Sequence, residues 1–162
     1  FWSAYFYLHF YTVNTAKLSE NVWKEAEKML EQIQKYPQKE EYQKLVEADR
    51  INLYEREAEK GDDRKFLEET DRVFKENLKG DPAWKLYERK LVYLESKQPD
   101  ISREFERFLK KYPKVMDAYV EYSIYLCRNN KMTQAQRVYR EGRKQTGMTS
   151  KRAEELRRKL GL

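Results

Sequence analysis

The chain has 162 residues and a mass of 19.9 kDa, which is long enough for one domain with a hydrophobic core. Five Gly and four Pro are few for an all-β protein, which needs a turn roughly every 8 to 12 residues, and 13 Tyr, seven Phe and three Trp exclude a disordered chain. A single cysteine excludes a disulfide framework, and no apolar run reaches the roughly 18 residues of a transmembrane helix. We therefore expect one all-α domain, and a first residue other than Met indicates a fragment of a longer protein.

The net charge of +6 belongs to one end of the chain. Residues 1–132 hold 25 basic and 25 acidic side chains, which cancel. Residues 133–162 hold nine basic and three acidic side chains. The sequence therefore predicts a neutral, charge-rich body with a basic C-terminal end.

Capping and breaking residues divide the chain into nine predicted helices. No alternating stretch of useful length competes with this interpretation. In chain order the helices cover residues 2–13, 19–35, 39–60, 62–80, 81–97, 99–112, 114–128, 133–147 and 151–160.

Three helix starts carry specific signals. Asp81–Pro82 is typical of an N-cap followed by an N1 proline at the start of the fifth helix. Thr133 and Gln136 have the spacing of a capping box for the eighth helix. Either Thr149 or Ser150 caps the ninth helix.

The predicted helices form pairs that share a pattern. The first helix of each pair carries an aromatic residue and, three positions later, a second residue of the inward stripe: Trp2 and Tyr5, Tyr42 and Leu45, Trp84 and Tyr87, and Tyr119 and Tyr122. The second helix carries a large apolar residue eight positions before its Pro or Gly stop: Met29, Phe74, Phe105 and Tyr139. Stacked hairpins of this kind bury a continuous core that one hairpin cannot form. The pattern predicts an α-α superhelix (an α-solenoid) of four hairpins, at about 1–37, 38–80, 81–113 and 114–147, with a capping helix at 149–161; an irregular helical bundle is the alternative.

These residues resemble the HAT (half-a-tetratricopeptide) repeat, over about 150 residues of the chain. The clearest match is Trp84 and Tyr87 followed by Arg103 and Phe105. The repeat-defining core positions are Trp2, Tyr5, Trp84, Tyr87, Phe105, Tyr119, Tyr122 and Tyr139. The chain departs from the repeat where a glutamate is usual on the first helix, with His9, Asp49, Leu91 and Leu126 in its place.

The resemblance implies a non-enzymatic protein–protein scaffold. HAT proteins serve in RNA-processing assemblies, including pre-mRNA splicing particles and the small-subunit processome of ribosome biogenesis. It also implies a nuclear location, including the nucleolus, with other proteins of the assembly as partners and no membrane; a homodimer stays open. The rival is a TPR-like peptide-binding adaptor, but the small residues that TPR repeats place at helix crossings are missing from the pattern.

The sequence predicts no catalytic, metal or cofactor site. The sole histidine, His9, is expected to be packed or hydrogen-bonded between helices, because no second histidine accompanies it. The sole cysteine, Cys127, is expected to be buried, because no CxxC or His-rich spacing indicates a metal. The glycines stand mostly at helix ends, so they form no phosphate-binding loop.

Two surfaces are predicted to contact partners. The first is basic and consists of Arg140, Lys144, Lys151, Arg152, Arg157, Arg158 and Lys159. It is a polar cap of the stack, a docking surface for an acidic segment of another protein, or an RNA contact. The second is aromatic, because Phe6, Tyr7 and Phe10 lie off the stripe of Tyr5 and make the first helix apolar nearly all round. A longer stack or a partner is expected to cover it.

Overall fold

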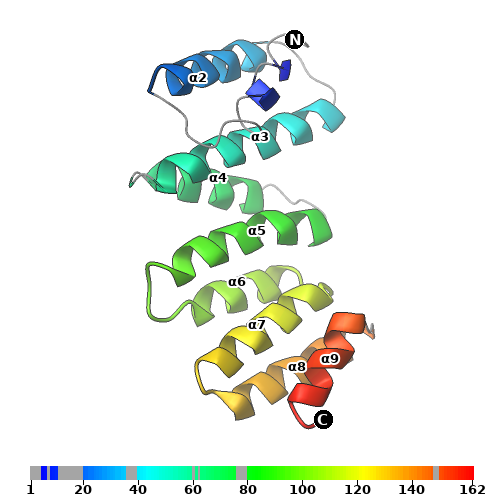
Figure 1. The fold of residues 1–162 in the computed structure, drawn as a ribbon. Helices are drawn as coiled ribbons and strands as arrows, with labels where there is room; N and C mark the ends of the chain where they lie inside the picture. The colour runs from blue at the N-terminus through cyan, green and yellow to red at the C-terminus, as the bar shows by residue number, and fades with distance from the viewer. Residues whose placement is uncertain are drawn as a thin grey trace. The chain divides into compact units, whose positions relative to one another are not determined.

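The computed structural model describes residues 5–6, 8–10, 20–35, 40–59, 61, 63–75, 80–147 and 150–162. Within these ranges the chain forms helices and no β-strand, which confirms the all-α class (Figure 1). Trp2 and Tyr7 lie outside the described residues. Residues 5–6 and 8–10 are helical, and the longer helices are α2 (Glu20–Gln34), α3 (Glu40–Glu59), α4 (Arg64–Lys75), α5 (Gly80–Glu95), α6 (Ser102–Lys111), α7 (Met116–Arg128), α8 (Met132–Thr146) and α9 (Lys151–Lys159).

The chain, predicted as one domain, groups into two compact units. The N-terminal unit spans Phe1–Arg72 and the C-terminal unit spans Val73–Leu162. Each unit has its own packed core and is described by itself.

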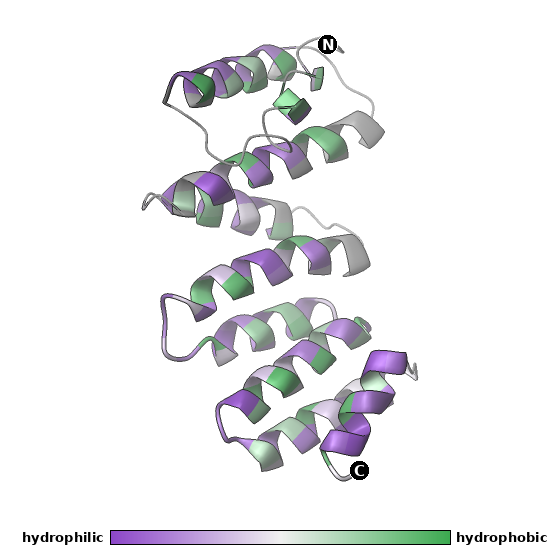
Figure 2. Ribbon diagram, in the orientation of Figure 1, coloured by the Kyte–Doolittle hydropathy of each residue, from purple (hydrophilic) through white to green (hydrophobic). Residues whose placement is uncertain are grey.

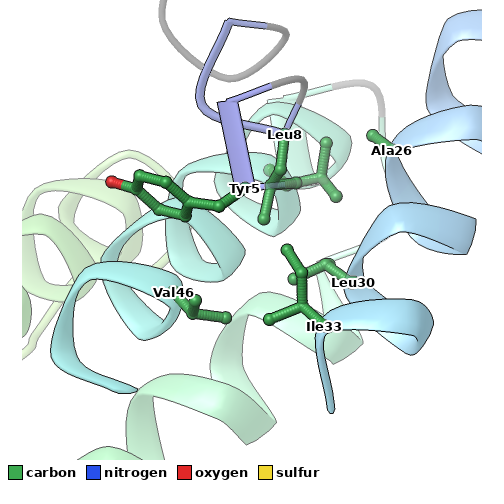
Figure 3. Packing of buried hydrophobic residues seen from close by; sticks show 7 residues of the cluster. Tyr5, Leu8, Ala26, Leu30, Ile33 and Val46 are labelled. Carbon is green, nitrogen blue, oxygen red and sulfur yellow. The ribbon is translucent and has the colours of Figure 1, made fainter. Parts of the chain in front are cut away.

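The core of the N-terminal unit lies between the first helical residues, α2 and α3. Leu30 and Ile33 of α2 point toward Val46 of α3, with Leu8 beside them (Figure 3). The spacing of the buried residues on α2 places them on one face of the helix. Leu45 was predicted on the inward stripe but is 46% exposed, because the buried stripe of α3 runs through Val46 and the neighbouring position is turned away from it. The side chain of Tyr42 lies outside the described residues.

The core of the C-terminal unit is built from aromatic rings of successive helices. Phe105 of α6 stacks on Tyr122 of α7 with ring centres 4.8 Å apart and an interplanar angle of 9°. Trp84 of α5 meets Phe108 of α6 edge-on at 5.1 Å. The repeat-defining core positions named for the HAT resemblance are buried wherever the structure describes them: Tyr5, Trp84, Tyr87, Phe105, Tyr119, Tyr122 and Tyr139.

The helices of the C-terminal unit pack in a regular order. Consecutive helices are in contact from α5 to α8 (Figure 1). In addition, α5 contacts α7, and α7 contacts α9. Within this unit, the first helices of the two predicted hairpins, α5 and α7, therefore contact each other, and α7 contacts the predicted capping helix α9.

A polar network joins α5 to α6. The Glu104 carboxylate accepts hydrogen bonds from the Tyr87 hydroxyl at 2.6 Å and from Lys90 Nζ at 2.9 Å. Lys90 is only 4% exposed, so it is a buried cation with a carboxylate partner. Burial raises the pKa of Glu104, but the hydrogen bonds from Tyr87 and Lys90 and the charges of Lys90 and Arg107 outweigh it and hold the pKa below its usual value.

Two of the predicted helix-start signals differ from the structure. Helix α5 begins at Gly80, so Asp81–Pro82 lies inside its first turn, and Gly80 does not end the preceding helix. Helix α8 begins at Met132 with Lys131 as N-cap, and no side chain caps it, so the Thr133–Gln136 capping box is wrong. The physical reason is the turn after α7: the Lys131 N–H donates to the Leu126 carbonyl at 2.9 Å, and the N-cap of α8 falls at Lys131, two residues before Thr133.

Two helix ends follow the prediction. Ser150 caps α9, because its Oγ accepts the Ala153 N–H at 3.1 Å. Gly147 ends α8 in the left-handed conformation, with φ of 62°. The alternative cap, Thr149, lies outside the described residues.

Gly142 sits in the middle of α8, at a helix crossing with α7. A Cβ at this position would lie 2.6 Å from both Cβ and Cγ of Tyr119. No real carbon pair approaches so closely, so only glycine fits between these helices here. Gly142 is thus a single small residue at a helix crossing, and the absence of the recurrent TPR pattern of small residues stays a prediction.

Candidate interaction surfaces

The predicted basic residues lie on two helices of the C-terminal unit. Arg140 and Lys144 are on α8, and the other five are on α9. Helix α9 is hydrophilic along nearly its whole length (Figure 2) and buries only Ala153 and Leu156 of its nine residues. This composition fits the outward face of a terminal helix.

Arg157 is held within the unit. Its Nε donates to Glu154 Oε2 at 2.8 Å, and its Nη1 donates to the Leu162 carbonyl. Glu154 also accepts from Arg143 of α8 at 3.0 Å. The hydrogen bond from Arg157, with a smaller contribution from Arg143, lowers the pKa of Glu154. Arg157 was predicted to contact a partner. In the structure it shares the Glu154 carboxylate with Arg143, and this network joins α8 to α9.

Arg152 has a partner on α7 but stays accessible. It forms an ion pair with Glu121, whose side chain is 14% exposed. Burial raises the pKa of Glu121, while the charge of Arg152 lowers it. The Arg152 side chain is 56% exposed, so its guanidinium keeps a face toward solvent.

The other five predicted cations are exposed. They are Arg140, Lys144, Lys151, Arg158 and Lys159. In the described part of the chain, no carboxylate pairs with any of them. Their charges are therefore available for a solvated cap or for a partner.

A groove of about 350 Å³ opens between α7 and α9, and we refer to it as the α7–α9 groove. It brings together two of the predicted cations, Arg152 and Lys159, whereas Arg140 and Lys144 do not line it. Its lining residues are Ile124, Cys127, Arg128, Met132, Arg152, Glu155, Leu156 and Lys159. Sequence reasoning missed Arg128 because its position follows from how α9 packs on α7, and no periodicity within one helix encodes that packing.

A second groove, of about 630 Å³, lies beside α6, α7 and α8. Tyr119 and Tyr122, predicted as core residues, form part of its floor. The Tyr122 hydroxyl donates to Glu106 Oε1 at 3.1 Å, and burial raises the pKa of Tyr122 to about 12. The charged residues around it balance in sign: Glu106, Lys110, Arg137 and Glu141.

The aromatic N-terminal residues are partly exposed. Phe6 is 64% exposed and Phe10 is 55% exposed, whereas Tyr5 and Leu8 are buried. The first helix therefore buries one face within the N-terminal unit and leaves these two rings accessible. Docking of a partner here stays a prediction.

The prediction for His9 is confirmed. His9 Nδ1 lies 3.1 Å from each carboxylate oxygen of Asp49 on α3. Asp49 is 3% exposed, and the His9 ring stacks on Tyr5 with centres 5.8 Å apart. His9 thus connects the first helix to α3.

The prediction for Cys127 is wrong. The side chain is half-buried, because it faces the α7–α9 groove, where its Sγ lies 4.0 Å from Met132 Sδ. Partial burial raises the pKa of the thiol.

Metal binding and membrane crossing can be judged for the described ranges alone. There, no group of three or more His, Cys, Asp or Glu residues could hold a metal ion. Among the same residues, no helix combines the length and the apolar character needed to span a bilayer.

Comparison of the chain with protein-family models, curated proteins and solved structures finds no match in any of the three.

Proposed function

We propose that the chain is a non-enzymatic scaffold for protein–protein interactions, built as an α-solenoid of HAT-like hairpins that α9 caps. The observation that carries the proposal is the order of helix contacts in the C-terminal unit. Consecutive helices meet from α5 to α8, α5 meets α7, and α7 meets α9. In a stack of hairpins, each repeat contacts only its neighbours, and first helix packs on first helix.

Burial of the repeat positions supports the same proposal. Trp84 and Tyr87 on α5 and Tyr119 and Tyr122 on α7 are buried where the two helices enter the core. Phe105 of α6 stacks on Tyr122 of the next hairpin. An aromatic side chain that fills the space between consecutive hairpins is what a repeating core requires.

On the resemblance to HAT repeats, we propose that the scaffold acts in a nuclear RNA-processing assembly, either for splicing or for ribosome biogenesis in the nucleolus. Other proteins of that assembly are its proposed partners. The protein has no catalytic role in this proposal.

Affinity purification of the tagged protein from its own cells tests the proposal. We expect proteins of one RNA-processing assembly to co-purify, and we expect them to remain after nuclease treatment, because proteins and not RNA hold them. A variant with Trp84→Ala and Tyr122→Ala, which disrupts two repeat positions, is the control that should lose them. Recovery of no such proteins, or complete loss after nuclease treatment, would overturn the proposal.

Direct RNA contact is a second candidate function, because five of the predicted cations are exposed. Such binding would depend on salt through the release of counterions. Replacing Arg158 and Lys159 by Gln should then weaken binding of single-stranded RNA and reduce the salt slope by about 1.4. An unchanged affinity, or no salt dependence, would exclude this function.

A further inference from the structure

We propose that the α7–α9 groove binds an acidic amphipathic segment of a partner protein. The proposal rests on the scaffold function and specifies the chemistry of one partner. Three properties of the groove carry it: an apolar floor, cations held in place at its edge, and the absence of aromatic rings from its lining.

The floor of the groove is apolar and partly open to solvent. Ile124 and Leu156 line it from α7 and α9, and Met132 is 47% exposed beside them. Its volume of about 350 Å³ lies at the lower end of the roughly 300–1,000 Å³ typical of ligand pockets. That space suits one or two apolar side chains of a bound segment, and the flexible thioether of Met132 can adjust to their shape.

The edge of the groove presents two arginines, each of which forms an ion pair within the chain. Arg128 pairs with Glu95 at 3.3 Å, and Arg152 pairs with Glu121. Their side chains are nevertheless 58% and 56% exposed. A guanidinium has five N–H donors, so each can bind a second carboxylate while keeping the first. Because the carboxylates already hold these side chains, a ligand pays less entropy to order them.

The charge around the groove favours an acidic ligand. The lining holds Arg128, Arg152, Lys159 and one carboxylate, Glu155. Glu95 and Glu121 offset the charges of the two arginines, so the positive excess comes from the lysine and from neighbouring cations. Lys151 and Arg158 are exposed on the same helix. A positive edge around an apolar floor attracts a segment in which carboxylates flank a hydrophobic anchor.

The composition of the lining also favours a protein ligand over single-stranded RNA and over a second copy of this chain. Single-stranded RNA binds on aromatic rings that stack with its bases, and none of the residues that line this groove is aromatic. In a symmetric contact with a second copy, the same cations would face each other and repel. A peptide with apolar and acidic side chains satisfies both the floor and the edge.

Cys127 provides a direct measurement, because it lines the groove and is the only cysteine in the chain. The rate at which dithionitrobenzoate modifies its thiol can be followed in the full chain. The probe is a synthetic peptide of Leu, Phe, Glu and Asp with apolar residues at every third or fourth position. We expect this peptide to slow the modification in a saturable manner. Peptides with Lys in place of Glu and Asp, or with Ser in place of Leu and Phe, should not protect the thiol.

Variants test the floor and the edge separately. Lys159→Gln should lower the affinity for the acidic peptide about two- to fivefold, as expected for the loss of one exposed charge contact. Met132→Gln should also lower the affinity for the peptide, because it replaces an apolar side chain of the groove floor by a polar one. Lys114→Gln is the matched control, because Lys114 is exposed in the turn between α6 and α7. This variant should bind the acidic peptide with the affinity of the wild type.

Several results would overturn the proposal. They are the absence of protection by the acidic peptide, equal protection by an oligouridine, and protection that grows with protein concentration alone, as a second copy would give. The scaffold function is tested independently. If assembly proteins co-purify but the peptide gives no protection, the groove proposal fails and the scaffold stands; if the peptide protects but nothing co-purifies, the scaffold proposal fails.

Discussion

Replacing Gly142 by Ala tests the close crossing of α7 and α8. The new Cβ would lie 2.6 Å from Cβ and Cγ of Tyr119, compared with about 3.5–4.0 Å for a normal carbon contact. Neither Tyr119 atom can swing away, because Cβ is attached to the backbone and Cγ is attached to Cβ. The two helices must therefore move apart by about 1 Å along a packed interface.

The expected magnitude is the balance of two effects. Overpacking of a close helix contact lowers the free energy of unfolding by about 1–3 kcal/mol. The cost at this site should lie toward the upper end of that range, because the atoms that meet are rigidly held. Alanine gains about 1 kcal/mol over glycine in a helix interior. We therefore expect Gly142→Ala to lower the free energy of unfolding by about 1–2 kcal/mol, which corresponds to a decrease in Tm of roughly 5–10 °C for a unit of this size.

Thermal and urea unfolding followed by circular dichroism measure this change. Lys144→Ala is the control, because Lys144 is exposed on the same helix and its replacement should change stability by less than about 0.5 kcal/mol. Gly142→Val should cost more than Gly142→Ala. A Gly142→Ala variant that is more stable than the wild type by the full propensity difference would refute the close approach.

Three further predictions concern the caps, the polar network and the core. Ser150→Ala should cost about 1 kcal/mol in urea unfolding, because the Ala153 N–H loses its acceptor, and a Ser150→Asp variant should retain stability. The lowered pKa of Glu104 means that its contribution to stability is present above the unfolded-state pKa and is lost as the pH falls through the lower folded-state pKa. Unfolding measured across acidic pH should therefore show a smaller decrease for Glu104→Gln than for the wild type, and identical slopes would contradict the network. Leu30→Ala, in the core of the N-terminal unit, should cost about 2–5 kcal/mol, and a loss below 1 kcal/mol would show that the cluster around it is loosely packed.

Much of the local structure followed from short-range signals in the sequence. The helices lie close to their predicted ranges, because apolar periodicity and helix-ending glycines act within a few residues of the chain. Ser150 was one of two predicted caps, and Gly147 ends its helix in the conformation that favours glycine. Helix boundaries were less accurate. The Thr133–Gln136 capping box failed because a backbone hydrogen bond from Lys131 started α8 earlier, and the Gln136 amide instead donates to the Leu160 carbonyl at 2.8 Å.

Only part of the candidate interaction surface could be predicted from the sequence. Composition located the excess positive charge in the last 30 residues, and this part of the prediction needs nothing beyond counting. Which of those cations are engaged within the fold was not visible, because Glu121 and Glu154 reach Arg152 and Arg157 only after α9 has packed. Arg128 comes from a neutral part of the chain and was missed for the same reason.

The sequence by itself determined the all-α class, the order of the helices, the buried aromatic positions and the basic C-terminal end, because periodicity, capping and charge are properties of neighbouring residues. Only the tertiary structure decided which surfaces those residues form. Gly142 meets Tyr119, His9 meets Asp49, and Arg128 comes to lie beside Arg152 at one groove. These contacts join residues far apart in the chain, and their geometry depends on how whole helices pack, which no local pattern specifies.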